Sequence, residues 1–131
     1  PPGSVVLAAD TAVEIGGEIL GKPENAEDAA RMLRLLSGAT HSVLTGVCLV
    51  CSPSRLHALE VEVTAVTFRH LNEEEIQRYI ATGEPFDKAG AYGIQAGASK
   101  FVTRVEGCFF NVVGLPMARV CEMLQSLPDG R

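Results

Sequence analysis

The pattern of hydrophobic and polar positions changes period along the chain, which predicts alternating strands and helices. Residues 5–9 form a short apolar run without alternation, which is typical of a buried strand. Residues 12–15 and 18–20 flank Gly16 and Gly17, and a glycine pair between two apolar runs favours a tight hairpin turn. We therefore expect the chain to open with strands.

Three later segments have helical spacing. Asn25 comes before acidic residues and an apolar stripe that stops at Gly38, and Asn72 comes before a run of glutamates and a stripe that stops at Gly83. Asparagine is a favoured N-cap, and acids in the first turn complement the helix dipole. A last helix is expected from Leu115-Pro116, with one apolar face formed by Met117, Val120, Cys121 and Leu124.

Two β-rich runs lie between the first two helices, at residues 41–51 and 59–68. The polar connector at residues 52–57 contains a proline, and it predicts that the two runs are antiparallel neighbours. Residues 100–106 alternate as a further strand. Together these elements predict a single domain over residues 1–131.

Composition narrows the set of partners. The net charge is -5, whereas binding a nucleic-acid backbone requires clustered Lys and Arg, so nucleic acid is not an expected partner. The longest apolar runs are too short to cross a membrane, and the sequence does not open with a basic region leading into an apolar one. We therefore expect a cytoplasmic protein.

Four cysteines and three histidines raise the question of a metal site. Cys48 and Cys51 have the two-residue gap of a zinc knuckle or redox pair, but they lie inside an alternating apolar run. We interpret the cysteines as structural thiols, with zinc or redox chemistry as the alternative. His41, His57 and His70 lack the spacing of a shared metal site, and we expect surface or capping positions for them.

The stretch from Gly83 to Gly97 concentrates unusual side chains. It places charged and amide groups between four glycines and a proline, a composition that we take to be too polar for core. Glycine-rich loops form turns more often than they bind ligands, but here Lys88 and Gln95 stand among backbone that a ligand can approach closely. We interpret the stretch as a binding loop.

Two further candidates lie near the start of the chain. Asp10 follows the strand expected at residues 5–9, and open α/β sheets bind ligands outside the carboxyl ends of their strands. Alternatively, Asp10 caps a turn. Lys22 lies between Gly21 and Pro23 in extended backbone, which leaves its ammonium free to reach toward Asp10, or else it is an ordinary surface lysine.

The order and spacing of these residues resemble one known family across nearly the whole chain. The segments that carry the resemblance are Asp10-Thr11, Ile19-Leu20-Gly21-Lys22-Pro23, Met32-Leu33, Leu36-Ser37-Gly38, His41, Thr45-Gly46-Val47, Gly83-Glu84-Pro85, Asp87-Lys88-Ala89-Gly90-Ala91-Tyr92-Gly93-Ile94-Gln95 and Asn111-Val112-Val113-Gly114-Leu115-Pro116. Through them the chain resembles the Maf family of nucleotide pyrophosphatases.

The resemblance implies a fold and an activity. The implied fold is α/β, a mixed sheet with flanking helices and a cleft, similar to that of the house-cleaning inosine triphosphatases. The implied reaction splits a nucleoside triphosphate between its α and β phosphates, with magnesium or manganese as the divalent metal. The products are the monophosphate and pyrophosphate.

The resemblance also implies roles for residues. Asp10 matches the catalytic carboxylate that accepts a proton from the attacking water and is a candidate metal ligand, and Lys22 matches a phosphate-facing lysine. Thr11 and Gln95 match positions associated with base choice. This pair resembles the branch of the family that acts on dTTP and UTP.

Elementary chemistry agrees with those roles. A carboxylate can take the proton of water directly or through a metal, and a lysine can stabilise the charge on phosphate oxygens, a role open to Lys22 and Lys88. A pyrimidine edge presents an N–H donor beside carbonyl acceptors, and the amide of Gln95 has an acceptor and a donor to meet them. A wrong base would leave buried polar groups unpaired.

One family feature has no counterpart in this sequence. Members begin with a further strand and a loop rich in serine, proline and arginine, followed by another glutamate and lysine, and these groups would grip the triphosphate and assist the metal or the water. Loss of that strand would leave a sheet edge or a core face uncovered. We therefore expect an N-terminally truncated Maf domain, which is a fragment, an alternative form or a non-catalytic relative.

Two functions follow from the resemblance. The first is hydrolysis of dTTP or UTP, or of modified pyrimidine nucleotides. The alternative is a catalytically impaired domain that binds nucleotides or is purely structural. Maf domains also occur fused to a methyltransferase-like domain in acetylserotonin methyltransferase-like proteins, so a larger fusion protein is a candidate assembly. Apolar surface left by the absent segment makes a homodimer a second candidate.

Overall fold

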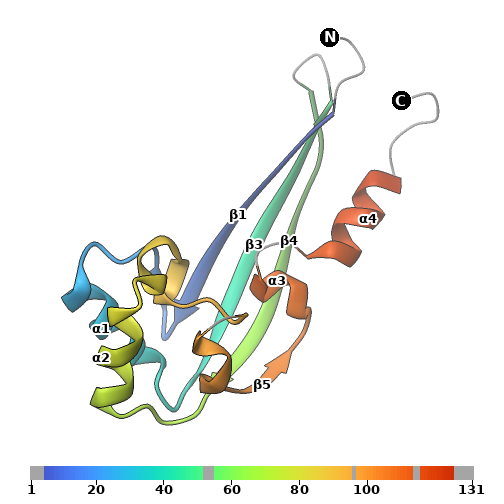
Figure 1. The fold of residues 1–131 in the computed structure, drawn as a ribbon. Coiled ribbons are helices and arrows are strands. Elements are labelled where there is room, and N and C mark those ends of the chain that lie inside the picture. The colour runs from blue at the N-terminus through green and yellow to red at the C-terminus, as the bar shows by residue number, and fades with distance from the viewer. Residues whose placement is uncertain (1–4, 52–54, 96, 114–115, 126–131) are drawn as a thin grey trace.

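A five-stranded sheet organises the protein, and the computed structural model describes residues 5–51, 55–95, 97–113 and 116–125. The strand order is β2-β1-β3-β4-β5. Figure 1 shows β1, β3 and β4 as long ribbons that run away from a lobe of helices. The strands are β1 (Val5–Ile15), β2 (Glu18–Leu20), β3 (Thr40–Cys51), β4 (Arg55–Phe68) and β5 (Val102–Glu106).

Helices flank this sheet, which confirms the expected α/β class. The four described strand pairings are all antiparallel, so a mixed pattern is not seen in this part of the chain. The helices are α1 (Ala26–Leu36), α2 (Glu73–Ala81), α3 (Phe109–Val113) and α4 (Met117–Gln125), with short 3-10 helices η1 (Glu84–Asp87), η2 (Ala89–Ala91) and η3 (Gly97–Phe101).

Local sequence signals fix several of these elements. Gly16 and Gly17 have φ values of 58° and 89°, as the expected two-residue hairpin between β1 and β2 requires. The side chain of Asn25 accepts a hydrogen bond from the backbone N–H of Asp28 at 2.8 Å. Asn72 and Glu75 form a reciprocal capping box at the start of α2. The predicted hairpin and both predicted N-caps are therefore confirmed.

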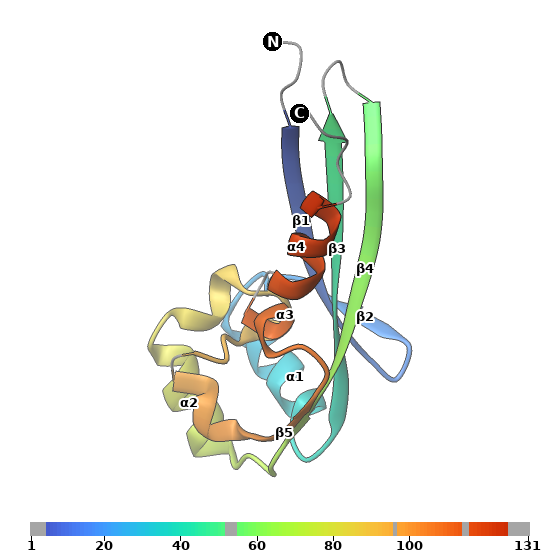
Figure 2. The same ribbon diagram turned by 90° about the vertical axis from the view of Figure 1, so that its right-hand side faces the viewer.

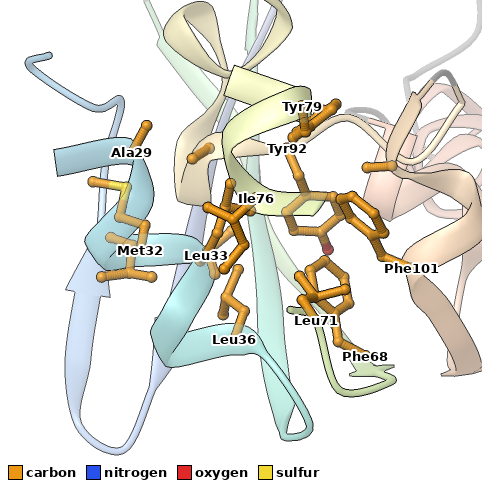
Figure 3. Packing of buried hydrophobic residues seen from close by; sticks show 14 of the residues in the cluster. Ala29, Met32, Leu33, Leu36, Phe68, Leu71, Ile76, Tyr79, Tyr92 and Phe101 are labelled. Atoms are coloured by element: carbon orange, nitrogen blue, oxygen red, sulfur yellow. The ribbon is translucent and has the colours of Figure 1, made fainter. Parts of the chain in front are cut away.

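The main core lies in what we call the packed lobe, formed by α1, α2, residues 84–101 and the adjoining ends of the strands. Figure 3 shows its side chains interleaved between the two helices and the sheet. Leu33 and Leu36 on α1, Ile76 on α2 and Phe68 on β4 are all at most 1% exposed. The stripe predicted for the first helix therefore faces this core.

The stretch 83–97 contributes to that core. The prediction that this stretch is too polar to be buried is therefore wrong. Ala91, Tyr92 and Ile94 are buried in the main cluster. Glycines and 3-10 turns reverse the chain repeatedly, so several apolar residues between them point inward while Asp87 and Gln95 face outward.

The opposite end of the sheet, which we call the strand arm, comprises residues 5–12 of β1, 45–51 of β3 and 55–63 of β4. The prediction of a buried strand at residues 5–9 is wrong, because β1 is exposed from Val5 to Asp10. Val6 is 58% exposed, since the packed lobe does not extend over this part of β1. An unbroken apolar run signals a strand, but it does not decide whether another layer covers it.

The last helix covers part of one face of the strand arm. Figure 2 shows α4 lying along β3, where Val120 and Met123 pack against Val47 and Leu49. The predicted face is only partly correct, because Val120 is buried but Met117, Cys121 and Leu124 are exposed. Arg119 explains the rotation of the helix, since it pairs with Glu60 and Glu62 on β4 at 2.7 and 2.8 Å.

The histidines and cysteines form no metal cluster in the described part of the chain. No group of three His, Cys, Asp or Glu side chains there could hold an ion. His70 is exposed as predicted, whereas His41 is buried, which corrects the expectation of a surface or capping position. The side chain of His57 lies outside the described residues. No described helix is long and apolar enough to cross a membrane.

Candidate functional site

An open cleft of about 460 Å³ lies where the strand arm meets the packed lobe. Four consecutive residues of β1, numbers 10–13, line it, together with the turn after β2, the segment 87–89, Tyr92 and the end of α3. Consecutive strand residues point to alternate faces, so this lining indicates a cavity along the edge of β1 rather than over one face. In the described residues β2 pairs only with residues 13–15, which leaves that edge of β1 open at residues 10–12.

Two loops that carry lysines meet at this cleft. The backbone N–H of Gly90 donates a hydrogen bond to the carbonyl of Gly21 at 3.0 Å. Gly90 has a φ of +72°, and a Cβ at this position would lie 2.8 Å from the Cγ2 atom of Val13. Only glycine allows both the backbone conformation and this close approach. The contact brings Lys22 and Lys88 to one cavity.

Asp10 contributes a carboxylate from the edge strand. It lies in the middle of β1 opposite Gly46, which corrects its predicted place at the end of a strand. It is exposed, and within the described residues its carboxylate makes no hydrogen bond or ion pair. An unengaged carboxylate at a cleft is available to bind a water molecule, a cation or a ligand donor.

Thr11 lines the same cleft, and its hydroxyl is held by a residue of the neighbouring strand β3. Its Oγ1 lies 3.0 Å from the Oγ1 of Thr45, the residue directly opposite on β3. Thr45 is buried, so this hydroxyl pair fixes the rotamer of Thr11 rather than offering a second ligand contact. Thr64 on the neighbouring strand β4 is buried and accepts a hydrogen bond from Asn111 Nδ2 at 3.0 Å.

The lysines share the cleft with a second carboxylate, that of Asp87. The Nζ of Lys88 donates to Asp87 Oδ1 at 3.1 Å. This hydrogen bond is the main cause of the lowered pKa of Asp87, and the more distant charge of Lys22 adds to it. Sequence reasoning did not assign Asp87 to the site, although its place beside Lys88 was an available signal.

Gln95 lies in an adjoining pocket of about 240 Å³ rather than in the main cleft. The two cavities share Lys88, Tyr92, Val112 and Val113 as lining residues. Asp10, Thr11, Lys22 and Lys88 thus come together in one cavity, and Gln95 is exposed in the next. A ligand that fills both cavities would touch all five predicted residues.

Tyr92 forms part of the wall common to both cavities, and sequence reasoning missed its importance. Its hydroxyl lies 2.7 Å from the Nε2 of His41 inside the core. Burial lowers the pKa of His41 to about 4, so the ring is neutral at pH 7. The rings of His41, Phe68 and Tyr92 meet edge to face with centres 4.8–5.4 Å apart, which makes this wall rigid.

These groups define a class of site. A free carboxylate, two lysines and an adjoining pocket with an amide on an apolar wall suit a ligand that is anionic at one end and carries a planar polar group at the other. The protein is thus an α/β domain with an open cleft at the edge of its sheet.

Comparison with known sequences gives the family. The profile of the family described as Maf-like protein matches residues 1–127, and the chain belongs to this family. It is 54% identical over 123 residues to a protein of Caldicellulosiruptor bescii named dTTP/UTP pyrophosphatase. The aligned region covers 94% of this chain and 62% of that protein. It is 56% identical over 126 residues to a protein of the same name from an Anaeromyxobacter species, with the same two coverages. The chain therefore spans somewhat less than two thirds of the length of these curated relatives.

Proposed function

We propose that the chain is a Maf-like domain of a nucleoside triphosphate pyrophosphatase that acts on dTTP and UTP. The observation that carries this proposal is the meeting of Asp10, Thr11, Lys22 and Lys88 in one cleft, with Gln95 in the adjoining pocket. The names of the relatives from Caldicellulosiruptor bescii and Anaeromyxobacter support the choice of substrate.

The proposed reaction is hydrolysis at the α phosphate. The oxygen of water forms a bond to the α phosphorus, the bond from that phosphorus to the bridging oxygen breaks, and pyrophosphate leaves. Asp10 accepts the proton of the water, because a carboxylate can act as a general base when it is close to the attacking group. Lys22 and Lys88 stabilise the negative charge that the phosphate oxygens carry.

We further propose that a divalent cation, magnesium or manganese, takes part. Magnesium is usually held by one or two carboxylates together with substrate phosphates and water, rather than by a full set of protein ligands. The cleft offers Asp10 as such a carboxylate, and Asp87 also belongs to its lining. When bound, the ion would supply further positive charge to the phosphates and lower the pKa of a coordinated water molecule.

Base choice is assigned to Gln95 and Thr11. Gln95 is exposed in a pocket whose wall includes Tyr92, Val112 and Val113, so its amide can face the edge of a ring that lies on apolar side chains. Thr11 has its hydroxyl oriented by Thr45 and lines the neighbouring cleft. Polar groups fixed in this way discriminate well, because a mismatched base leaves them unpaired.

We place this activity in the cytoplasm, as a house-cleaning step that removes unwanted pyrimidine nucleotides. Cys48, Cys108 and Cys121 are free thiols, which is usual in a reducing compartment. Nucleic acid is not part of the proposal, because the net charge of -5 opposes a phosphate backbone.

The test is pyrophosphate release by the purified chain with magnesium or manganese, across dTTP, UTP, CTP, GTP and ATP. We expect release from dTTP and UTP above the other nucleotides. Gln95→Ala should reduce the ratio of turnover on dTTP and UTP to turnover on the other nucleotides. This reduction should be larger than the loss of turnover on the best substrate. An equal preference before and after the substitution would remove Gln95 from the site.

A second candidate function is nucleotide binding without turnover. Its support is the pairing of Lys88 with Asp87, which leaves Lys22 as the one lysine of the described cleft lining outside an ion pair. A well-folded chain that binds dTTP in a calorimeter but releases no pyrophosphate would favour this candidate.

A further inference from the structure

Tyr79 touches the loop that carries Gln95, although it lies outside the main cleft. It is a buried residue of α2, and its ring stands edge-on to Phe101 with the ring centres 5.4 Å apart. Its hydroxyl donates to Glu84 Oε1 at 3.0 Å and accepts from the backbone N–H of Gly93 at 3.1 Å. Tyr79 therefore joins the start of the loop to the residue two positions before Gln95.

Glu84 holds the other side of the same segment. Its Oε2 accepts a hydrogen bond from the backbone N–H of Gly97 at 3.4 Å. A Cβ on Gly97 would lie 3.2 Å from the ring of Tyr79, so the backbone approaches this pair as closely as glycine permits. One carboxylate thus holds both flanks of Gln95, Gly93 through the tyrosine hydroxyl and Gly97 directly.

The pair is itself supported by the end of α2. The hydroxyl of Thr82 donates to the carbonyl of Tyr79 at 2.6 Å and accepts from the backbone N–H of Glu84 at 3.2 Å. Burial is the main cause of the raised pKa of Tyr79, so its hydroxyl keeps its proton and remains a donor to Glu84. The anchor of the loop is therefore built on a helix, which fixes position better than a loop does.

We propose that Tyr79 and Glu84 are positioning residues for base choice, which fix Gly93 and Gly97 so that Gln95 presents its amide at a set place in the adjoining pocket. The inference rests on the proposed function. When the amide of Gln95 is held in place, it cannot pair with a mismatched base. A loosely held amide can shift and pair with the correct base or with a mismatched one. Asp10 and Lys22 lie on β1 and the turn after β2, so loosening this anchor should affect base recognition more than the chemical step.

The first test is structural and needs no activity. Tyr79→Phe removes the hydroxyl and keeps the ring, and Ser37→Ala is a matched control because it removes another hydroxyl that accepts from a backbone N–H, that of Leu71 at 2.7 Å, outside the loop. Amide hydrogen exchange at Gly93, followed by NMR, should become about tenfold faster in Tyr79→Phe, as expected when one hydrogen bond of a local opening is lost. It should stay at the wild-type rate in Ser37→Ala.

The second test measures selectivity. In Tyr79→Phe we expect KM for dTTP to rise about tenfold with kcat changed far less, and the preference for dTTP over GTP to shrink. Glu84→Gln keeps an acceptor oxygen for Tyr79 but loses the charge, so it should fall between the wild type and Tyr79→Phe. A purely structural role would lower thermal stability without moving the ratio of the two nucleotides.

The outcomes separate this inference from the function on which it rests. Unchanged exchange at Gly93 in Tyr79→Phe would overturn the anchor. Faster exchange with an unchanged nucleotide preference would overturn the role in base choice. A wild-type chain that neither binds nor hydrolyses dTTP would refute the proposed function and the base-choice role with it, while the exchange rates would still decide whether the anchor exists.

Discussion

The packed lobe and the strand arm are built from similar strands but bury them very differently. In the lobe, Val43, Val66 and Phe68 are at most 2% exposed beneath two helices and a loop. On the arm, Leu59, Val61 and Val63 are 52–63% exposed, and the second hydrophobic cluster is a small one beneath α4. The difference teaches that an apolar strand pattern specifies a strand, while its burial depends on which other elements reach it.

The cleft lies on the boundary between these two regions. Asp10 and Thr11 come from the arm, whereas Lys88 and Tyr92 come from the lobe. Gly90 makes the junction, through its backbone hydrogen bond to Gly21 and its contact with Val13. The lobe can therefore position Lys88 and the pocket that contains Gln95 against a carboxylate on an open strand.

The largest expected effect is in the lobe. Leu33→Ala removes a fully buried side chain between α1, α2 and the sheet, and it should lower the free energy of unfolding by about 3–5 kcal/mol. Urea denaturation monitored by circular dichroism measures this. A loss below about 1 kcal/mol would mean that the lobe can collapse around the cavity and is not the close-packed core described above.

The same substitution in the second cluster should cost less. Leu49→Ala also removes a fully buried leucine, but its cluster contains only Val47, Val120 and Met123 besides it among the described buried residues. We expect a loss of about 2–3 kcal/mol in the same urea experiment, because the cost depends on how well the site can close. A loss as large as that of Leu33→Ala would show that the arm is packed as firmly as the lobe.

Acid should weaken the lobe through His41. Its pKa is about 4 in the folded protein against an ordinary 6.5, so the unfolded chain binds the extra proton between these values. Stability contributed by the neutral ring is therefore present above pH 6.5 and is lost as the pH falls toward 4. Between pH 7 and pH 5 we expect a loss of about 2 kcal/mol in the free energy of unfolding.

The control for this prediction is His41→Gln, which cannot titrate in that range. Glu75, whose folded pKa is lowered to about 2 by its hydrogen bond from Arg69, affects stability only nearer and below its ordinary value of 4.5. The acid loss between pH 7 and pH 5 should therefore be smaller in His41→Gln. If the free energy of unfolding had the same pH dependence in the wild type and in His41→Gln, this would contradict the buried, neutral state of His41.

The smallest effect is expected on the open face of the arm. Leu59 is 63% exposed, so Leu59→Ala should change the free energy of unfolding by at most about 0.5 kcal/mol. With Leu33→Ala and Leu49→Ala it forms a series of identical chemical changes in three settings, the main core, the small second cluster and the open face. A loss above about 2 kcal/mol would mean that another surface covers this face in solution.

Much of the fold could be predicted because its signals are local. Asn25 and Asn72 are N-caps with acids after them, and Gly16-Gly17 is a hairpin turn, so each specifies its element within a few residues. The burial of β1 and the orientation of α4 could not be predicted in this way. Both depend on distant partners, such as the pairing of Arg119 with Glu60 and Glu62.

The site was only partly accessible from the sequence for the same reason. Motif resemblance pointed to Asp10 and Lys22, and the chemistry of the loop pointed to Lys88, and the fold brings all three to one cleft. The hydrogen bonds of Tyr79 to Glu84 and Gly93 join residues whose spacing carries no signal in a single sequence. The contact between His41 and Tyr92 also could not be predicted from the sequence, because 51 positions separate the two residues.

The central claim is that the carboxylate of Asp10 on the open strand acts on the ligand held by the lobe. Its most direct test compares pyrophosphate release from dTTP by the wild type and by Asp10→Asn. The substitution keeps the size of the side chain but removes a proton acceptor. We predict a loss of about 100- to 10,000-fold in turnover, the range that a general base contributes, with dTTP binding largely retained. Turnover equal to that of the wild type would contradict the role assigned to Asp10.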